Sequence, residues 1–159
     1  AEKSVAHIPE EESFWANRGT RIHRALQDFF ENGKETDFTE HDEQECYDIL
    51  QYRVKRLTIK QLQSRVDMVE CERRLWVYDG TEPIASGRAD LFIFSGTTML
   101  IVDFKSGRGN VTSADRNWQL ATLALAAWQE YSDTIDNYLV ALAQPFVPGD
   151  PVVCRYTSE

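Results

Sequence analysis

Residues 87–107 read GRADLFIFSGTTMLIVDFKSG, and this stretch decides the fold. Two apolar runs rich in β-branched and aromatic residues flank a Ser-Gly-Thr-Thr turn signal, which is typical of two paired strands. A two-residue turn at Gly96-Thr97 suits a type II′ hairpin, because glycine stands at the first central position. Counting outward from that turn, the hairpin places Asp90 opposite Asp103.

Two acids that face each other in this way need a positive charge between them. Their Cβ atoms would lie roughly 5 Å apart, where like charges destabilise the ladder. Carboxylate oxygens suit Mg²⁺ or Mn²⁺. Lys105 is two residues after Asp103, so it projects from the same face of the strand and can orient a water or offset charge on a phosphoryl group. The sequence therefore predicts a metal-dependent site for phosphodiester hydrolysis, built on Asp90, Asp103 and Lys105.

An Asp-x-Lys triplet also has a plainer interpretation, a surface ion pair on an exposed strand. Against it, Asp103 follows the apolar run Leu100-Ile101-Val102 in a strand with a buried pattern, where a lone charge is costly. A further alternative is an unrelated soluble protein in which the acidic pair is a coincidence.

The residues before the hairpin predict two helices and a set of strands. Apolar side chains recur at helical spacing over about 13–31, and Asn32-Gly33 supplies the stop. A second helix is expected over about 40–63, which contains no Gly or Pro. After Ser64, the pattern predicts three consecutive antiparallel strands over 66–78, 84–94 and 99–105.

The residues after the hairpin predict a helix and two strands. The helix begins at Ser113 or Asp115 and runs through Tyr131. It is apolar on nearly every side, so we expect it to be packed deep against the sheet. A short strand over 138–143 and an edge strand over 152–156 follow. The fold class is therefore α/β, a mixed central sheet with a three-strand antiparallel meander and one or two further strands, flanked by helices.

Composition bounds the remaining organisation. With 159 residues, 42% of them hydrophobic, the chain suffices for one domain with a core, over residues 1–159. We expect a soluble, intracellular and cytoplasmic protein, because no membrane helix or signal peptide stands out. Cys46, Cys71 and Cys154 lack CxxC spacing, which argues for ordinary thiols over a disulfide framework or a metal cluster. The chain as a fragment of a longer protein stays open.

The net charge is −9 at pH 7, which is unfavourable for an enzyme that acts on nucleic acid. Its distribution is uneven, because residues 28–48 are strongly acidic whereas residues 53–74 are mainly basic. The second stretch predicts a basic face for phosphate contacts. A solvated helix surface is the alternative.

Four motifs occur in order along residues 19–123. They are Gly19-Thr20-Arg21-Ile22-His23 in the first helix, Gly87-Arg88-Ala89-Asp90, then Ile101-Val102-Asp103-Phe104-Lys105-Ser106-Gly107, and Gln119 in a later helix. Together they resemble the RecB-type branch of the PD-(D/E)XK nucleases. The resemblance implies a restriction-endonuclease-like core and a DNA exonuclease of recombination or repair. Leu123 stands where many members of that branch have a tyrosine, and the iron-sulfur cysteines of some members are absent.

The resemblance also implies roles for single residues. It implies His23, Asp90, Asp103 and the Phe104 carbonyl as ligands of Mg²⁺ or Mn²⁺, with Lys105 as the catalytic lysine. Gln119 would be a buried amide that supports the site. Glu72 is a further candidate acid, expected opposite residues 87–90, and an ordinary exposed strand position is its alternative.

DNA is the expected partner. The candidate contacts are Arg21, Arg88 and Arg108, the last in a short loop whose amides can hold a phosphate. Gly19 is expected to leave room beside His23 for a metal or a DNA strand. A helicase or recombination partner and a homo-oligomer stay open. The main rival function is an inactive module of the same fold that binds DNA or scaffolds other proteins, which the acidic charge would suit.

Overall fold

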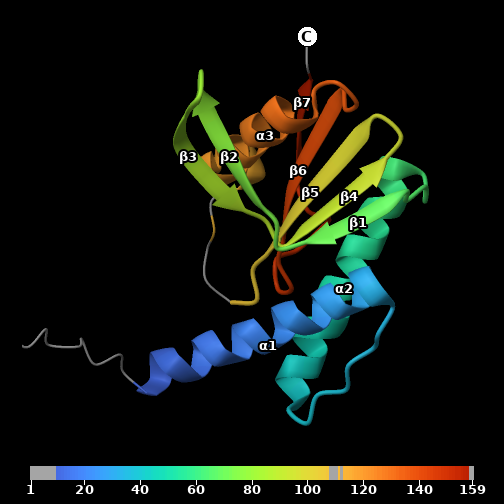
Figure 1. The fold of residues 1–159 in the computed structure, drawn as a ribbon. Coiled ribbons are helices and arrows are strands. Elements are labelled where there is room, and N and C mark those ends of the chain that lie inside the picture. The colour runs from blue at the N-terminus through green and yellow to red at the C-terminus, as the bar shows by residue number, and fades with distance from the viewer. Residues whose placement is uncertain (1–9, 108–110, 112, 158–159) are drawn as a thin grey trace, which may run out of the picture.

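The computed structural model describes residues 10–107, 111 and 113–157. In chain order its elements are α1 (Glu10–Asn32), α2 (His41–Leu62), β1 (Met68–Cys71), β2 (Arg74–Asp79), β3 (Glu82–Arg88), β4 (Leu91–Ser95), β5 (Thr98–Phe104), the 3-10 helix η1 (Ala114–Arg116), α3 (Trp118–Tyr131), β6 (Asn137–Ala143) and β7 (Val153–Thr157). Figure 1 shows them in three layers. A five-stranded sheet lies in the middle, α1 and α2 cover one face, and α3 with the β2–β3 hairpin covers the other.

The central sheet is mixed, in agreement with the predicted α/β class. Its strand order is β1-β4-β5-β6-β7, in which β5 and β6 run parallel and the other neighbours run antiparallel. Parallel neighbours need a crossover, and α3 provides it between β5 and β6. β7 is an edge strand, as the sequence predicted.

The two N-terminal helices form as predicted, and both bury an apolar face on the sheet. Ile22 and Leu26 of α1 and Leu50 of α2 are fully buried, in one cluster with Leu100 and Val102 of β5. The apolar spacing of α1 therefore determines which side of that helix meets the sheet. None of the helices within the described ranges is long and apolar enough to cross a membrane.

The strand prediction needs a correction, because two expected strands are each broken in two. The expected strand 66–78 is interrupted after β1, where Glu72 takes a left-handed φ of 53°. The expected strand 84–94 is interrupted between β3 and β4. These breaks let β1 pair with β4 in the main sheet, while β2 and β3 pair with each other in a separate sheet. The antiparallel set is thus β1, β4 and β5, with the β2–β3 hairpin inserted into it.

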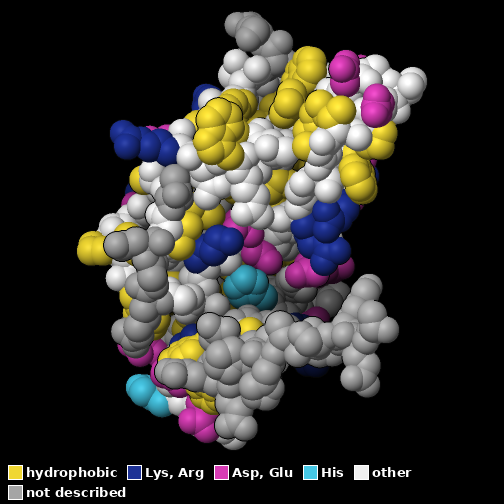
Figure 2. All heavy atoms as spheres, turned by 90° about the vertical axis from the view of Figure 1, so that its left-hand side faces the viewer, with side chains coloured by type: hydrophobic (Ala, Val, Ile, Leu, Met, Phe, Trp, Pro, Cys, Tyr) yellow, Lys and Arg dark blue, Asp and Glu magenta, His cyan; other side chains and the backbone are white. Residues whose placement is uncertain are grey.

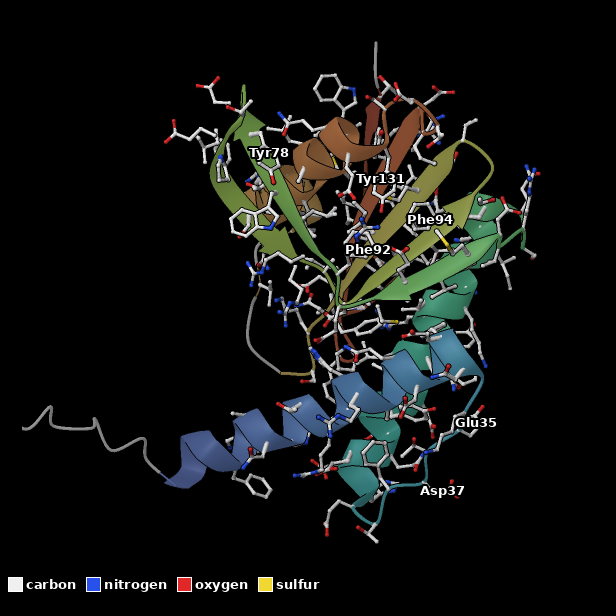
Figure 3. All side chains as sticks on the ribbon, viewed as in Figure 1. Glu35, Asp37, Tyr78, Phe92, Phe94 and Tyr131 are labelled. Atoms are coloured by element: carbon white, nitrogen blue, oxygen red, sulfur yellow. The ribbon has the colours of Figure 1, made fainter. Side chains whose placement is uncertain are left out.

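The α3 helix also differs from expectation. It begins at Trp118, and Asn117, not Ser113 or Asp115, caps it by accepting from the Leu120 N–H. One face packs on the sheet. Figure 3 shows Phe92, Phe94 and Tyr131 on that side, where the rings of Phe94 and Tyr131 lie 5.3 Å apart.

The opposite face of α3 is open, so the expected burial on nearly every side is wrong. Trp118 is 86% exposed, and Leu125 and Trp128 are also exposed. Hydrophobic side chains on this helix therefore exceed what the sheet can cover. No disulfide joins the three cysteines within the described residues; Cys46 is buried, and Cys71 and Cys154 are half-buried.

Candidate active site

The β4–β5 hairpin forms in the predicted register. Gly96 has a φ of 56°, which glycine adopts readily, and Ser95 pairs with Thr98 across the turn. Pairing continues to Leu91 opposite Val102. One step further out stand Asp90 and Asp103, 8% and 6% exposed. The interpretation of Asp103 as part of a surface ion pair is therefore wrong, because both acids are buried at the open end of the hairpin.

Asp90 is held by hydrogen bonds from two directions. Its Oδ2 accepts from the peptide N–H of Phe104 at 2.6 Å, and its Oδ1 lies 3.3 Å from Nδ1 of His23 on α1. Burial pushes the pKa of Asp90 upward, but the interaction with His23 and the hydrogen bonds from Asp103 and Phe104 outweigh it and keep the pKa below its usual value. Asp90 is therefore the carboxylate that stays charged.

Asp103 has the opposite electrostatics. Burial and its hydrogen bond with Asp90 raise the pKa of Asp103 to about 6, although Lys105 favours the charged form. The Lys105 Nζ lies 2.6 Å from Asp103 Oδ2, as expected for two side chains on the same face of a strand. The Lys105 backbone N–H donates to the carbonyl of Ala143 on β6, which fixes the end of the strand. The lysine thus supplies the positive charge that the acidic pair requires.

His23 lies on α1, in the helical layer that packs on the sheet, and completes a cluster with Asp90, Asp103 and Lys105. Its ring lies edge-on to Phe104, with centroids 5.8 Å apart. With Nδ1 turned to Asp90, its Nε2 is buried without a hydrogen-bond partner among the described residues. If Nδ1 carries the proton, Nε2 presents a lone pair, the arrangement found in metal-ligating histidines that a carboxylate orients. Figure 2 shows a histidine in a recess of the surface, beside acidic side chains and with Lys or Arg on both flanks.

The donor set suits a hard divalent cation, although it is not a preformed cage. Within the described residues, no group of three or more His, Cys, Asp and Glu side chains is arranged to hold a metal. Lys105 occupies the nearest oxygen of Asp103, and Asp90 uses both oxygens on neighbours. A cation would therefore require Lys105 to turn aside. The buried acid pair and the unpartnered Nε2 are the features that fit one.

The sequence suggested that Gly19 leaves room for a ligand, but the structure shows that it does not. A Cβ at this position would lie 3.0 Å from Oγ of Ser106, so the space is taken by the chain just after Lys105. The buried Arg18 reinforces the contact, because its guanidinium donates to the Ser106 carbonyl and pairs with Asp42. Sequence reasoning missed Arg18. The glycine next to it, which signals close backbone approach, was the available clue.

Glu72 lies where the sequence placed it but is not buried in the site. Its backbone N–H donates to the carbonyl of Asp90, so the two residues are neighbours at the ends of β1 and β4. Its exposed side chain accepts from Gln27 at 2.8 Å and from Arg88 at 3.4 Å. Glu72 thus lies at the edge of the candidate site, and its carboxylate is bound to Gln27 and Arg88 instead of the acid pair.

Gln119 is not the buried amide that was expected, because its side chain is exposed in the first turn of α3. The helix instead reaches the site region through Leu123, which is fully buried against Gly87. A Cβ on Gly87 would lie 2.9 Å from the Leu123 side chain. Leu123 therefore serves the packing between α3 and β3.

The three arginines that were predicted to contact DNA differ in what the structure shows of them. Arg21 is exposed and forms an ion pair with Glu43, so it braces α1 against α2. Arg88 is exposed at the end of β3, two residues before Asp90. Arg108 lies outside the described residues. Only Arg88, of the two described arginines, stands next to the acid pair in the chain.

Comparison with known proteins gives a family but no named activity. The model of the family described as "Protein of unknown function (DUF2800)" matches residues 1–152. No curated protein matches the chain. A solved structure described as "Crystal structure of SSO0001" is similar at 16% identity and a TM-score of 0.29, over 69% of this chain and 48% of that one. The chain thus spans about half the length of that protein, and the likeness is too low to carry an argument.

Proposed function

The chain belongs to the DUF2800 family, and from its site we propose that it is a metal-dependent nuclease that hydrolyses DNA phosphodiester bonds. The observation that carries this proposal is the buried pair Asp90 and Asp103, joined to Lys105 at one end and to His23 at the other. Burying two carboxylates costs several kcal/mol, roughly, unless a bound group repays it. Such a cost is typical of sites retained for chemistry.

The proposed ligand set is the one that the resemblance to RecB-type nucleases implies. Mg²⁺ or Mn²⁺ would be held by Asp90, Asp103, the Phe104 carbonyl and the imidazole of His23, and when bound it would polarise the phosphorus centre. In the structure, Lys105 forms an ion pair with Asp103. Released from that pair, its ammonium orients the attacking water and stabilises charge on the phosphoryl oxygens. Asp90 and His23 keep the geometry, because each fixes the orientation of the other.

Hydrolysis adds one water across a phosphorus–oxygen bond and releases a phosphate monoester and a hydroxyl end. The resemblance to RecB-type nucleases favours an exonuclease that acts in recombination or repair, inside the cell, with a helicase or recombination protein as partner. A DNA end also suits an acidic protein, since only a short stretch of backbone needs to contact its basic residues.

The decisive experiment compares linear and circular DNA as substrates. We expect labelled linear DNA to be degraded from its ends in Mg²⁺ or Mn²⁺ and to persist in EDTA, while covalently closed circles remain intact. Cleavage of circles would identify an endonuclease. Persistence of every substrate in both metals would refute the proposal.

Two observations favour a second candidate function. The net charge of −9 and the pairing of Lys105 with Asp103 would also suit an inactive module of the same fold that scaffolds another protein. The cation response separates the two. An inactive module should melt at the same temperature with Mn²⁺ and with EDTA, whereas a working site is stabilised by its metal.

A further inference from the structure

The β2–β3 hairpin has two different faces. Its inner face carries Leu75 and Val77, buried against α3. Its outer face carries the cross-strand pairs Arg74 with Arg88 and Trp76 with Ser86. The main chain then turns from Arg88 directly to Asp90. Arg88 is thus two residues from Asp90, and Figure 1 shows the base of the hairpin beside the start of β4.

The arginine pair on that face is unfavourable without an anion. Arg74 and Arg88 stand directly opposite each other, where like charges destabilise a ladder. Arg88 has a long contact of 3.4 Å to Glu72. Arg74 forms no ion pair within the described part of the chain and donates to the hydroxyl of Ser86.

The neighbouring Arg73 shows what a structural arginine looks like in this fold. It pairs with Glu70 and Glu130 and contacts the ring of Tyr131, so it fastens the start of β2 to α3. Arg74 has no such acidic partners among the described residues, although it is the next residue. Arg73 therefore holds the hairpin in place, whereas Arg74 is available to bind an external anion.

Trp76 adds a second kind of contact. Its side chain is 45% exposed on the same face, next in line after Arg74. A flat, half-exposed indole beside guanidinium groups fits a nucleotide whose base is unpaired, because the base stacks on the ring and its phosphate reaches the arginines. Bases of a duplex are stacked on one another and leave no face for the indole. The geometry therefore favours a single strand.

We propose that the outer face of the β2–β3 hairpin, made of Arg74, Trp76, Ser86 and Arg88, binds single-stranded DNA and leads it to the acid pair. This inference rests on the proposed nuclease function for its direction, and it names the substrate as a single-stranded end. Binding itself needs no hydrolysis, so the two ideas can fail separately.

The test measures binding of a fluorescein-labelled oligothymidine of about 15 nucleotides by anisotropy, in EDTA. Trp76→Ala should weaken binding about tenfold, whereas Trp76→Phe, which keeps a stacking ring, should stay within about threefold. Tyr52→Ala is the matched control, because Tyr52 is an aromatic residue on α2 that is even more exposed, at 60%. Circular dichroism shows whether each variant is folded.

The arginines are tested by salt dependence. For single strands, each phosphate contact contributes about 0.7 to the slope of log affinity against log salt. Arg74→Ala and Arg88→Ala should each reduce the slope by about that amount, and the exposed Arg65→Ala should not. A blunt duplex of the same length should bind more weakly and be insensitive to Trp76→Ala.

Three results would overturn the inference: no binding of the oligonucleotide by the wild type, equal binding by Trp76→Ala, or an equal loss for the duplex. Binding through Trp76 without cleavage in Mg²⁺ would support this inference but refute the proposed nuclease function. Cleavage that is unchanged by Trp76→Ala, Arg74→Ala and Arg88→Ala would support the nuclease function but refute this inference.

Discussion

The two β-hairpins that meet at Asp90 are built for different tasks. In β4–β5 nearly every side chain is buried, and the two acids at its open end are fixed by neighbours on both sides. In β2–β3 only one face is buried, and the other presents arginines and an indole to solvent. Chemistry requires positions that do not move, whereas binding a flexible strand requires exposed groups that adapt. If both proposals hold, catalysis and recognition lie on separate hairpins.

The largest effect that would test this division is expected at Lys105, whose ammonium group contacts Asp103. If it acts in the chemical step, Lys105→Ala should lower cleavage about 100-fold or more and leave oligonucleotide binding nearly unchanged. Single-turnover cleavage and anisotropy on the same samples measure both. Lys34→Ala, in the connection between α1 and α2, is the matched control. Wild-type turnover of Lys105→Ala would move the chemistry elsewhere.

Removal of metal tests the buried hairpin alone. A cation that binds only the folded protein stabilises it by about 2.7 kcal/mol at a hundredfold excess over Kd, so Mn²⁺ should raise the melting temperature by several degrees over EDTA. Asp103→Asn should abolish the response, and Asp133→Asn, on an exposed surface, should keep it. A response that survives Asp103→Asn would mean that the cation binds away from the acid pair.

The attachment of the exposed hairpin is tested at Gly87. A Cβ there meets Leu123 at 2.9 Å, so Gly87→Ala forces α3 and β3 apart and should cost about 1–3 kcal/mol of unfolding free energy. Gly107→Ala is the control, because nothing in the described ranges lies within 4 Å of a Cβ there. Urea denaturation compares the two. Equal stability would show that the hairpin does not depend on this contact.

The smallest effect distinguishes the two aspartates. Burial disfavours the charge of Asp103, whereas Asp90 accepts hydrogen bonds from Phe104 and His23. In EDTA near neutral pH, the melting temperature of Asp103→Asn should therefore be at or slightly above that of the wild type, and that of Asp90→Asn should be below it. The free energies of unfolding of the two variants should differ by about 1 kcal/mol. If the order is reversed, Asp103 is the acid that the fold relies on.

The acid pair could be predicted from the sequence because everything that determines it is local. A glycine turn sets the register, and the register sets which residues face each other, so Asp90, Asp103 and Lys105 follow from a short stretch. The two N-terminal helices likewise follow from their own periodicity.

The rest depends on contacts between distant segments. The expected pairing of 66–78 with 84–94 is kept, but nothing near Glu72 announces that the first strand breaks there into β1 and β2, because a left-handed φ at a non-glycine residue has no sequence signal. The same holds for Gly19, whose neighbour Ser106 arrives from another layer. Gln119 was expected to be buried from the apolar residues around it, but the open face of α3 depends on how far the sheet extends.

The two-residue turn at Gly96-Thr97 also determines when the site forms. A hairpin closes within about microseconds, whereas pairing between segments distant in sequence, such as β5 with β6, is slower. Asp90 and Asp103 would therefore meet before Ala143 arrives to fix the backbone of Lys105. Their repulsion opposes the earliest step of folding, and ions that screen the two charges relieve it. The residues proposed to cut DNA thereby slow the folding of their own chain.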